Sequence, residues 1–137
     1  MTASVAAVRN DVISRDDVPV LEHTVADELT AMAEAWDWFE NLVGLQGRRM
    51  FARVDESAGT YTVCTPLKPG DSFDLAVGVL PGGRYRRAVL EGEPPELYGR
   101  IGAAMEELKA LGPWDSSRPL VEFYRRHTAI ELWVPVS

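Results

Sequence analysis

Cysteine and histidine are scarce in this 137-residue chain, which contains one cysteine and two histidines. Cys64 has no partner for an internal disulfide, and a lone thiol is typical of a reducing compartment such as the cytoplasm, the expected location. His23 and His127 have no cysteine, histidine or carboxylate at the spacing of metal ligands, which disfavours a zinc site and haem bound through His23. The sequence therefore predicts neither metal nor cofactor, and a passive strand position for Cys64.

Positive charge is also in short supply, with 14 basic against 21 acidic residues and a formal net charge of -7. A nucleic-acid-binding protein needs a concentrated positive surface, so direct binding to nucleic acid is not expected. No apolar run approaches the length of a membrane span, and residues 1–10 lack the apolar core of a signal peptide. An acidic protein suits cationic ligands, although surface acidity also serves solubility.

Several catalytic signatures are missing as well. There is no Gly-x-Ser-x-Gly elbow, no phosphate-binding glycine loop and no nucleotide fingerprint, and Pro81-Gly82-Gly83 predicts only a turn. A helix-turn-helix pattern is absent too, so the chain is not a complete transcription factor. The length predicts a single domain over residues 1–137, as monomer or homodimer.

What is present is a regular succession of strands and helices. Apolar residues at helical spacing predict one helix over residues 25–43, capped by Thr24, and a second over residues 94–111, opened by Pro94-Pro95. The mainly apolar stretch 73–79 suits the interior of a sheet. The predicted strands are residues 11–14, 18–22, 49–55, 60–65, 73–79, 84–91, 120–124 and 130–136.

The first predicted helix has a wide apolar surface. Its two neighbouring stripes cover roughly 200° of the helix, more than packing on one sheet requires. Either this helix is covered on two sides, or part of its aromatic surface lines a cavity or an interface. Trp38 and Phe39 cannot both point deep into one surface, so at least one should be partly exposed. The stripes consist of Leu29, Met32, Ala33, Trp36, Phe39 and Val43, and of Ala31, Ala35, Trp38 and Leu42.

The order strand, helix, strand, strand occurs twice, and the two halves match in sequence. Residues 20–22 resemble residues 89–91, and residues 75–79 resemble residues 132–136. We therefore expect an α+β fold of two duplicated βαββ units, 11–79 and 80–137, that form one antiparallel sheet with both helices on one face and a groove between the halves. In this alignment Ala52 stands opposite Glu122, so the carboxylate is not duplicated.

Glu122 lies in a short strand among large apolar residues. Alternation places Leu120, Glu122 and Tyr124 on one face and Val121 and Phe123 on the other. The carboxylate is either a solvated residue on a strand face or the polar point of an apolar pocket. If it is buried, its pKa rises unless a cation or a hydrogen-bond donor compensates.

Four stretches occur in an order and spacing that resemble the GyrI-like family, also called the effector-binding or SOUL-type fold: FDLAVGV at 73–79, LPGGRY at 80–85, VEFY at 121–124 and ELWVPV at 131–136. The resemblance covers nearly the whole chain from Val12. It implies a groove with Glu122 at its base and Tyr124 beside it. Relatives include drug-sensing modules of regulators, stand-alone binders of lipophilic and often cationic molecules, and hydrolases of cyclopropane-bearing natural products.

One motif departs from the family. Where relatives carry His-x-Gly-Pro-Tyr before the second helix, this chain has LEGEPP at 90–95, which keeps Gly92 and lacks the histidine and the tyrosine. Ligand contacts that relatives make from those positions are therefore not expected here. Other aromatic residues could stack on a flat ligand or face a cation, although core packing is the alternative for most of them. These candidates are Trp36, Trp38, Phe39, Phe51, Tyr98 and Trp133.

Three functions follow. The leading hypothesis is a stand-alone, multidrug-type binding protein that captures aromatic or lipophilic compounds, including cationic ones, over Glu122. Such a protein would act as a sensor subunit, or in drug resistance by sequestering the compound. The alternative is a hydrolase of electrophilic natural products, for self-resistance or detoxification, in which Glu122 is the general base and Tyr124 donates to an oxyanion. The third is a module that binds a protein through its aromatic helix face.

Overall fold

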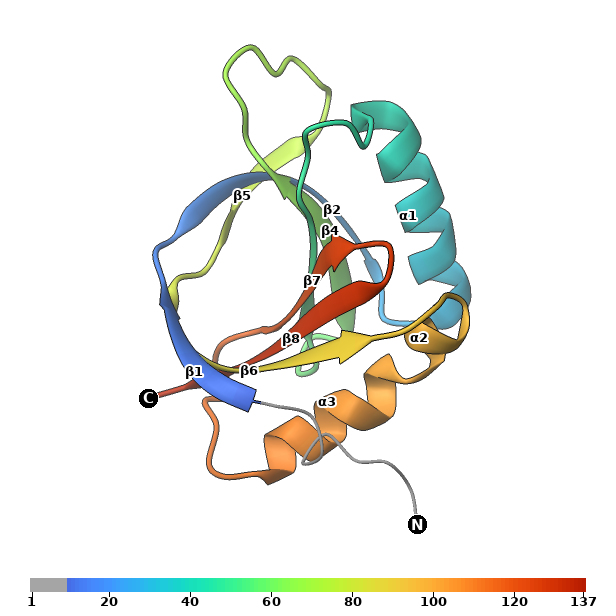
Figure 1. Cartoon of the computed structure of the whole chain (residues 1–137). Helices are drawn as coiled ribbons and strands as arrows, with labels where there is room; N and C mark the ends of the chain where they lie inside the picture. Colours follow the sequence, from blue (N-terminus) through green and yellow to red (C-terminus); the bar gives the residue numbers. More distant parts are fainter. Residues whose placement is uncertain (1–9) are drawn as a thin grey trace.

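The computed structural model describes residues 10–137, so nearly all of the segment 1–10, for which no signal peptide is expected, lies outside the described range. Three helices and one eight-stranded antiparallel sheet make up an α+β fold, which confirms the predicted class (Figure 1). In chain order the elements are β1 (Asn10–Arg15), β2 (Val18–Ala26), α1 (Leu29–Val43), β3 (Met50–Asp55), β4 (Thr60–Pro66), β5 (Ala76–Leu80), β6 (Gly83–Glu91), α2 (Glu96–Gly99), α3 (Ile101–Ala110), β7 (Leu120–Arg126) and β8 (Ala129–Val136).

The strand order in the sheet is β1-β6-β8-β7-β3-β4-β2-β5. β3 and β7 pair at its centre, with β4 and β2 on one side and β8 and β6 on the other. In the predicted duplicated arrangement β3 corresponds to β7, so the strand that corresponds to β8, the neighbour of β7, is β4, the neighbour of β3. The predicted match of residues 75–79 with residues 132–136 is wrong in position, because β5 lies at the edge beside β2.

Three local predictions are also wrong. In place of an interior strand at 73–79, the structure has the edge strand β5 at 76–80, and its Val77 and Val79 are 63% and 45% exposed. Thr24 does not cap a helix, since it lies in β2 and its hydroxyl bonds to that of Thr62 at 2.8 Å. The second predicted helix is divided at Arg100 into α2 and α3.

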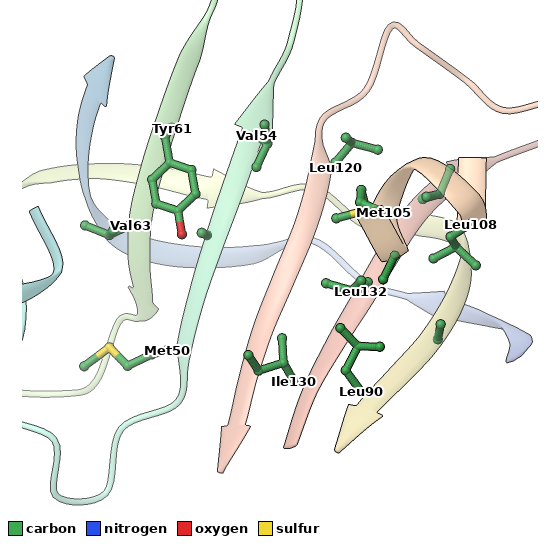
Figure 2. Packing of buried hydrophobic residues seen from close by; sticks show 14 of the residues in the cluster. Met50, Val54, Tyr61, Val63, Leu90, Met105, Leu108, Leu120, Ile130 and Leu132 are labelled. Carbon is green, nitrogen blue, oxygen red and sulfur yellow. The ribbon is translucent and has the colours of Figure 1, made fainter. Parts of the chain in front are cut away.

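The two faces of the sheet bury separate cores. On the helix face, α1, α2 and α3 pack on alternate residues of the strands, Ala52 among them. Figure 2 shows Leu120 and Leu132 of this cluster beside Met105 of α3. The sheet curves strongly away from the helices, as Figure 1 shows. On this opposite face Phe51, Val121 and Trp133 belong to a second buried cluster. Side chains of paired residues point to the same face of a sheet, and consecutive residues point to opposite faces. The pair Ala52–Glu122 therefore lies on the helix face, and the pair Phe51–Phe123 lies on the opposite face.

Within residues 10–137, no helix is long and apolar enough to cross a bilayer. The same residues contain no group of three or more cysteine, histidine or acidic side chains placed to hold a metal ion.

Candidate functional site

A cavity of about 860 Å³ lies on the helix face. Its floor is formed by β3, β4 and β7, and its walls by α1 on one side and α2 and α3 on the other. Three methionines contribute flexible, polarisable side chains to this lining, which suits ligands of varied shape. The apolar and aromatic lining residues are Leu29, Met32, Ala33, Trp36, Leu45, Met50, Val54, Tyr61, Tyr98, Ile101, Met105, Leu120 and Tyr124.

Glu122 lies on the floor of this cavity. It belongs to β7 at the centre of the sheet and is only 7% exposed. Tyr124 donates a 2.5 Å hydrogen bond to Oε1 of Glu122, and Tyr61 donates a second one of 2.9 Å to the same oxygen. Oε2 of Glu122 has no hydrogen-bond partner among the described residues. Glu122 is therefore a buried carboxylate on a cavity floor and not a solvated one on a strand face, and its role in binding stays a prediction.

Tyr61 reaches Glu122 from β4, across the intervening strand β3. The residue of β3 that pairs with Glu122 is Ala52, whose single methyl group leaves room above it for the tyrosine ring. A larger residue there would separate Tyr61 from the carboxylate. The small side chain of Ala52 is therefore part of the architecture of the site.

Trp36 joins the α1 wall to this cluster. Its Nε1 donates to the hydroxyl of Tyr61 at 3.0 Å, and its ring meets that of Tyr124 edge-on with centroids 4.9 Å apart. Tyr98 of α2 approaches Tyr124 from the other wall, at a centroid distance of 6.4 Å. The carboxylate is thus surrounded by aromatic rings from both walls and from the floor.

The environment of Glu122 acts on its ionisation in two directions. Burial raises the pKa of its carboxyl, the two tyrosine hydroxyls oppose that rise, and the charge of Asp27 adds to it. Burial, together with the Glu122 charge, raises the pKa of both Tyr61 and Tyr124 far above the usual value, so both hydroxyls keep their protons and act as donors. A cation near Oε2 would favour the ionised carboxylate, because opposite charges stabilise each other.

The other charges of the lining leave the cavity acidic. Its three arginines each face a carboxylate: Arg48 pairs with Asp71, Arg125 with Glu131 at 3.6 Å, and Arg126 with Glu91 at 3.6 Å. In contrast, Asp27, Glu40 and Glu122 have no basic partner among the described residues. The electrostatic balance of the cavity therefore favours cations.

The structure brings together half of the candidate residues named from the sequence. Glu122, Tyr124, Trp36 and Tyr98 all line the cavity. Phe51 and Trp133 lie on the opposite face of the sheet, where they pack against each other with centroids 5.8 Å apart. Strand alternation accounts for this outcome, since Phe51 directly precedes Ala52 in β3 and Trp133 directly follows Leu132 in β8.

The two remaining aromatic candidates of α1 also lie outside the cavity. Phe39 is fully buried against the sheet, and Trp38 is 47% exposed on the outer surface of α1, where its ring contacts His23. As expected, these consecutive residues do not both point inward. The wide apolar stripe is explained because Leu29, Met32, Ala33 and Trp36 line the cavity.

Sequence reasoning missed Tyr61, which contacts Glu122, Tyr124 and Trp36. Its strand was predicted, and alternation with the apolar Val63 could have placed it on a buried face. Its distance from Glu122 depends on β4 lying two strands from β7, which only the strand order reveals.

No protein-family model and no curated protein matches the sequence. Among solved structures, an integron cassette protein from the mobile metagenome of Vibrio cholerae is similar, with a TM-score of 0.68 and 16% identity over 93% of this chain and 95% of that one. SAV2435 bound to tetraphenylphosphonium has a TM-score of 0.66 and 15% identity over 94% of both chains. The EcmrR C-terminal domain has a TM-score of 0.64 and 10% identity over 95% of this chain and 98% of that domain.

At these identities the likeness establishes the fold. The chain shares the architecture of a protein whose structure was solved with a lipophilic cation bound. It covers nearly the whole length of each of these neighbours, so the likeness extends over nearly the whole fold.

Proposed function

We propose that this chain forms a small-molecule-binding domain of the GyrI-like type, which captures lipophilic cations over Glu122. The observation that carries the proposal is a carboxylate buried in an apolar cavity, with one oxygen bonded by two tyrosines and the other without a partner among the described residues. The binding site is the groove between the two halves of a duplicated fold. In support, the cavity floor includes β3 and β7, the central pair of the strand order.

A lipophilic cation fits this cavity for energetic reasons. Such ions spread their charge over apolar groups, so they lose less hydration than an ammonium ion when they are buried. The apolar lining supplies hydrophobic binding energy of about 25 cal/mol per Å². The faces of Trp36, Tyr98 and Tyr124 add cation–π attraction of about 0.5–2 kcal/mol each where they are well placed. Glu122 supplies the charge that distinguishes a cation from a neutral compound of similar shape.

The experiment compares a cation with a similar neutral compound. Tetraphenylphosphonium and triphenylphosphine oxide are titrated into wild type, Glu122→Gln and the control Glu34→Gln, which removes a charge from the exposed side of α1. Glu122→Gln should weaken the phosphonium by about 10- to 100-fold, as expected for loss of a partly desolvated charge interaction. Affinity for the oxide should change less than about twofold, and Glu34→Gln should bind like wild type.

Phosphonium affinity that is equal in wild type and Glu122→Gln would show that the carboxylate is not the anchor. If neither compound binds, small-molecule binding loses its support and the protein-interaction module gains. For that module the exposed Trp38 and Leu42 on the outer surface of α1 would be the contact residues.

The alternative is hydrolysis of a cyclopropane-bearing or similarly electrophilic natural product. It is supported by the raised pKa of Glu122 in an apolar cavity, which is a typical setting for a general base. Against it, Tyr61 and Tyr124 both direct their hydroxyl hydrogens to Glu122, so neither is free to donate to a developing oxyanion. Mass spectrometry of such a compound after incubation with the protein would show a water-addition product if the alternative holds.

A further inference from the structure

A second carboxylate of the cavity, Glu40, has no role in the site around Glu122. It lies on α1, lines the cavity, and has no basic partner among the described residues. Arg48, the nearest cavity arginine in sequence, is fully engaged elsewhere: its guanidinium bonds both carboxylate oxygens of Asp71 and the carbonyl of Pro66, and stacks over the ring of Phe73. Glu40 therefore presents an uncompensated negative charge to the cavity.

The position of Glu40 relative to Glu122 follows from the helix. Glu40 is one turn beyond Trp36, or about 6 Å along the α1 axis, on the same side of the helix. Trp36 is connected to Glu122 through Tyr61, by hydrogen bonds of 3.0 and 2.9 Å. The two carboxylates are thus separated by a distance on the order of 10 Å along the cavity wall.

The surroundings of Glu40 make its charge effective. Burial, and after it the charge of Asp37, raises the pKa of its carboxyl, and a cation beside it would favour the ionised form. Arg125 and Arg126, at the end of β7, also line the cavity, but each faces a carboxylate of its own. With these arginines balanced, Glu40 gives the cavity an acceptor for positive charge in addition to Glu122 and Asp27.

We propose that the preferred ligands are elongated amphiphilic dications, with a lipophilic cation over Glu122 and a second cationic group, about 10 Å away, beside Glu40. This inference rests on the proposed function, since it assigns the outer part of the same cavity. It makes Glu40 a specificity-determining residue that selects dications over monocations and contributes little to the binding of compounds that occupy the floor alone.

A matched pair of ligands tests the inference. The dication is 6-(trimethylammonio)hexyl-triphenylphosphonium, and its isostere is 7,7-dimethyloctyl-triphenylphosphonium, in which carbon replaces the second charged nitrogen. Both are titrated into wild type, Glu40→Gln, Asp27→Asn and Glu34→Gln by calorimetry at low salt. The measured quantity is the ratio of the two affinities, compared between variants, so that differences in ligand hydrophobicity cancel.

Glu40→Gln should lower the ratio of dication to isostere affinity by about fivefold to tenfold, and added salt should lower it in wild type. Glu34→Gln should leave the ratio within about twofold of wild type, and Asp27→Asn, which removes another unpaired carboxylate of the cavity, should lower it less than Glu40→Gln does. The inference is overturned if Glu40→Gln leaves the ratio unchanged, or if Asp27→Asn lowers it more than Glu40→Gln does.

The two proposals fail in different ways. If both phosphonium compounds bind and depend on Glu122, but Glu40→Gln leaves their ratio unchanged, only the assignment of Glu40 is wrong. If neither compound binds to wild type, the proposed function fails and the inference that rests on it fails with it.

Discussion

Removal of the Tyr61 hydroxyl tests the energetics of the buried carboxylate. Tyr61 is 2% exposed, so Tyr61→Phe keeps the packed ring and removes one donor to Glu122 at 2.9 Å and one acceptor for Trp36 at 3.0 Å. A hydrogen bond to a charged group contributes about 1.5–3 kcal/mol, and a neutral one about 0.5–1.5 kcal/mol. Because the partly exposed Trp36 can turn to water, we expect a net loss of about 2–3 kcal/mol in unfolding free energy at pH 8.

The assay is urea unfolding of a double-mutant cycle with Glu122→Gln. An amide oxygen accepts a weaker hydrogen bond than a carboxylate, so Tyr61→Phe should cost about 1–2 kcal/mol less in the Glu122→Gln background. The sign of the pH dependence follows from the pKa of Glu122, which the Tyr61 hydroxyl lowers. Loss of that hydroxyl raises the pKa further, so the penalty is largest at alkaline pH and shrinks as Glu122 becomes protonated on acidification.

Tyr98→Phe is the matched control, since Tyr98 is 47% exposed and its hydroxyl makes no hydrogen bond with a described residue. It should change the unfolding free energy by less than about 0.5 kcal/mol. The reasoning is refuted if Tyr61→Phe costs no more than Tyr98→Phe. A coupling energy near zero between Tyr61 and Glu122 at alkaline pH would refute it as well.

Three further outcomes are expected. Burial raises the pKa of Glu122, so wild type loses stability as pH rises through that pKa; Glu122→Gln should therefore be more stable than wild type at pH 8 in urea unfolding and no more stable below pH 4.5, the ordinary pKa of a glutamate carboxyl. Gly82→Ala should lower unfolding free energy by about 1–2 kcal/mol, because its Cβ would lie 2.6 Å from backbone atoms of residues 15–17, whereas Gly99→Ala, which meets open space, should not. Burial raises the pKa of Cys64 to about 12, so its thiol should react with an aromatic disulfide reagent only in urea.

The class of the fold and the place of Glu122 could be predicted from local patterns. Period-two alternation in β7 places Leu120, Glu122 and Tyr124 on one face, and the helical stripes of α1 predict a surface with more than one neighbour. Both signals depend on residues close in sequence. They are therefore available without knowledge of the strand order.

The rest of the site could not be predicted because it depends on which strands are neighbours. Phe51 and Trp133 are aromatic residues like Trp36, but their positions in β3 and β8 place them on the opposite face of the sheet. Tyr61 enters the site only because β3 lies between β4 and β7 and carries Ala52 at the level of Glu122. Sequence separation of 61 residues between Tyr61 and Glu122 leaves no local pattern that links them.

The separate cores on the two faces of the sheet affect how the cavity of this protein can evolve. Residues of the opposite face, such as Phe51 and Trp133, stabilise the strands that carry Glu122 and Tyr61 without lining the cavity. Substitutions on the two faces that share no contact should act on stability nearly independently. Lining residues that are not part of the helix-face core, such as Leu29 and Tyr98, can then diverge toward new compounds while the opposite core preserves its share of the stability.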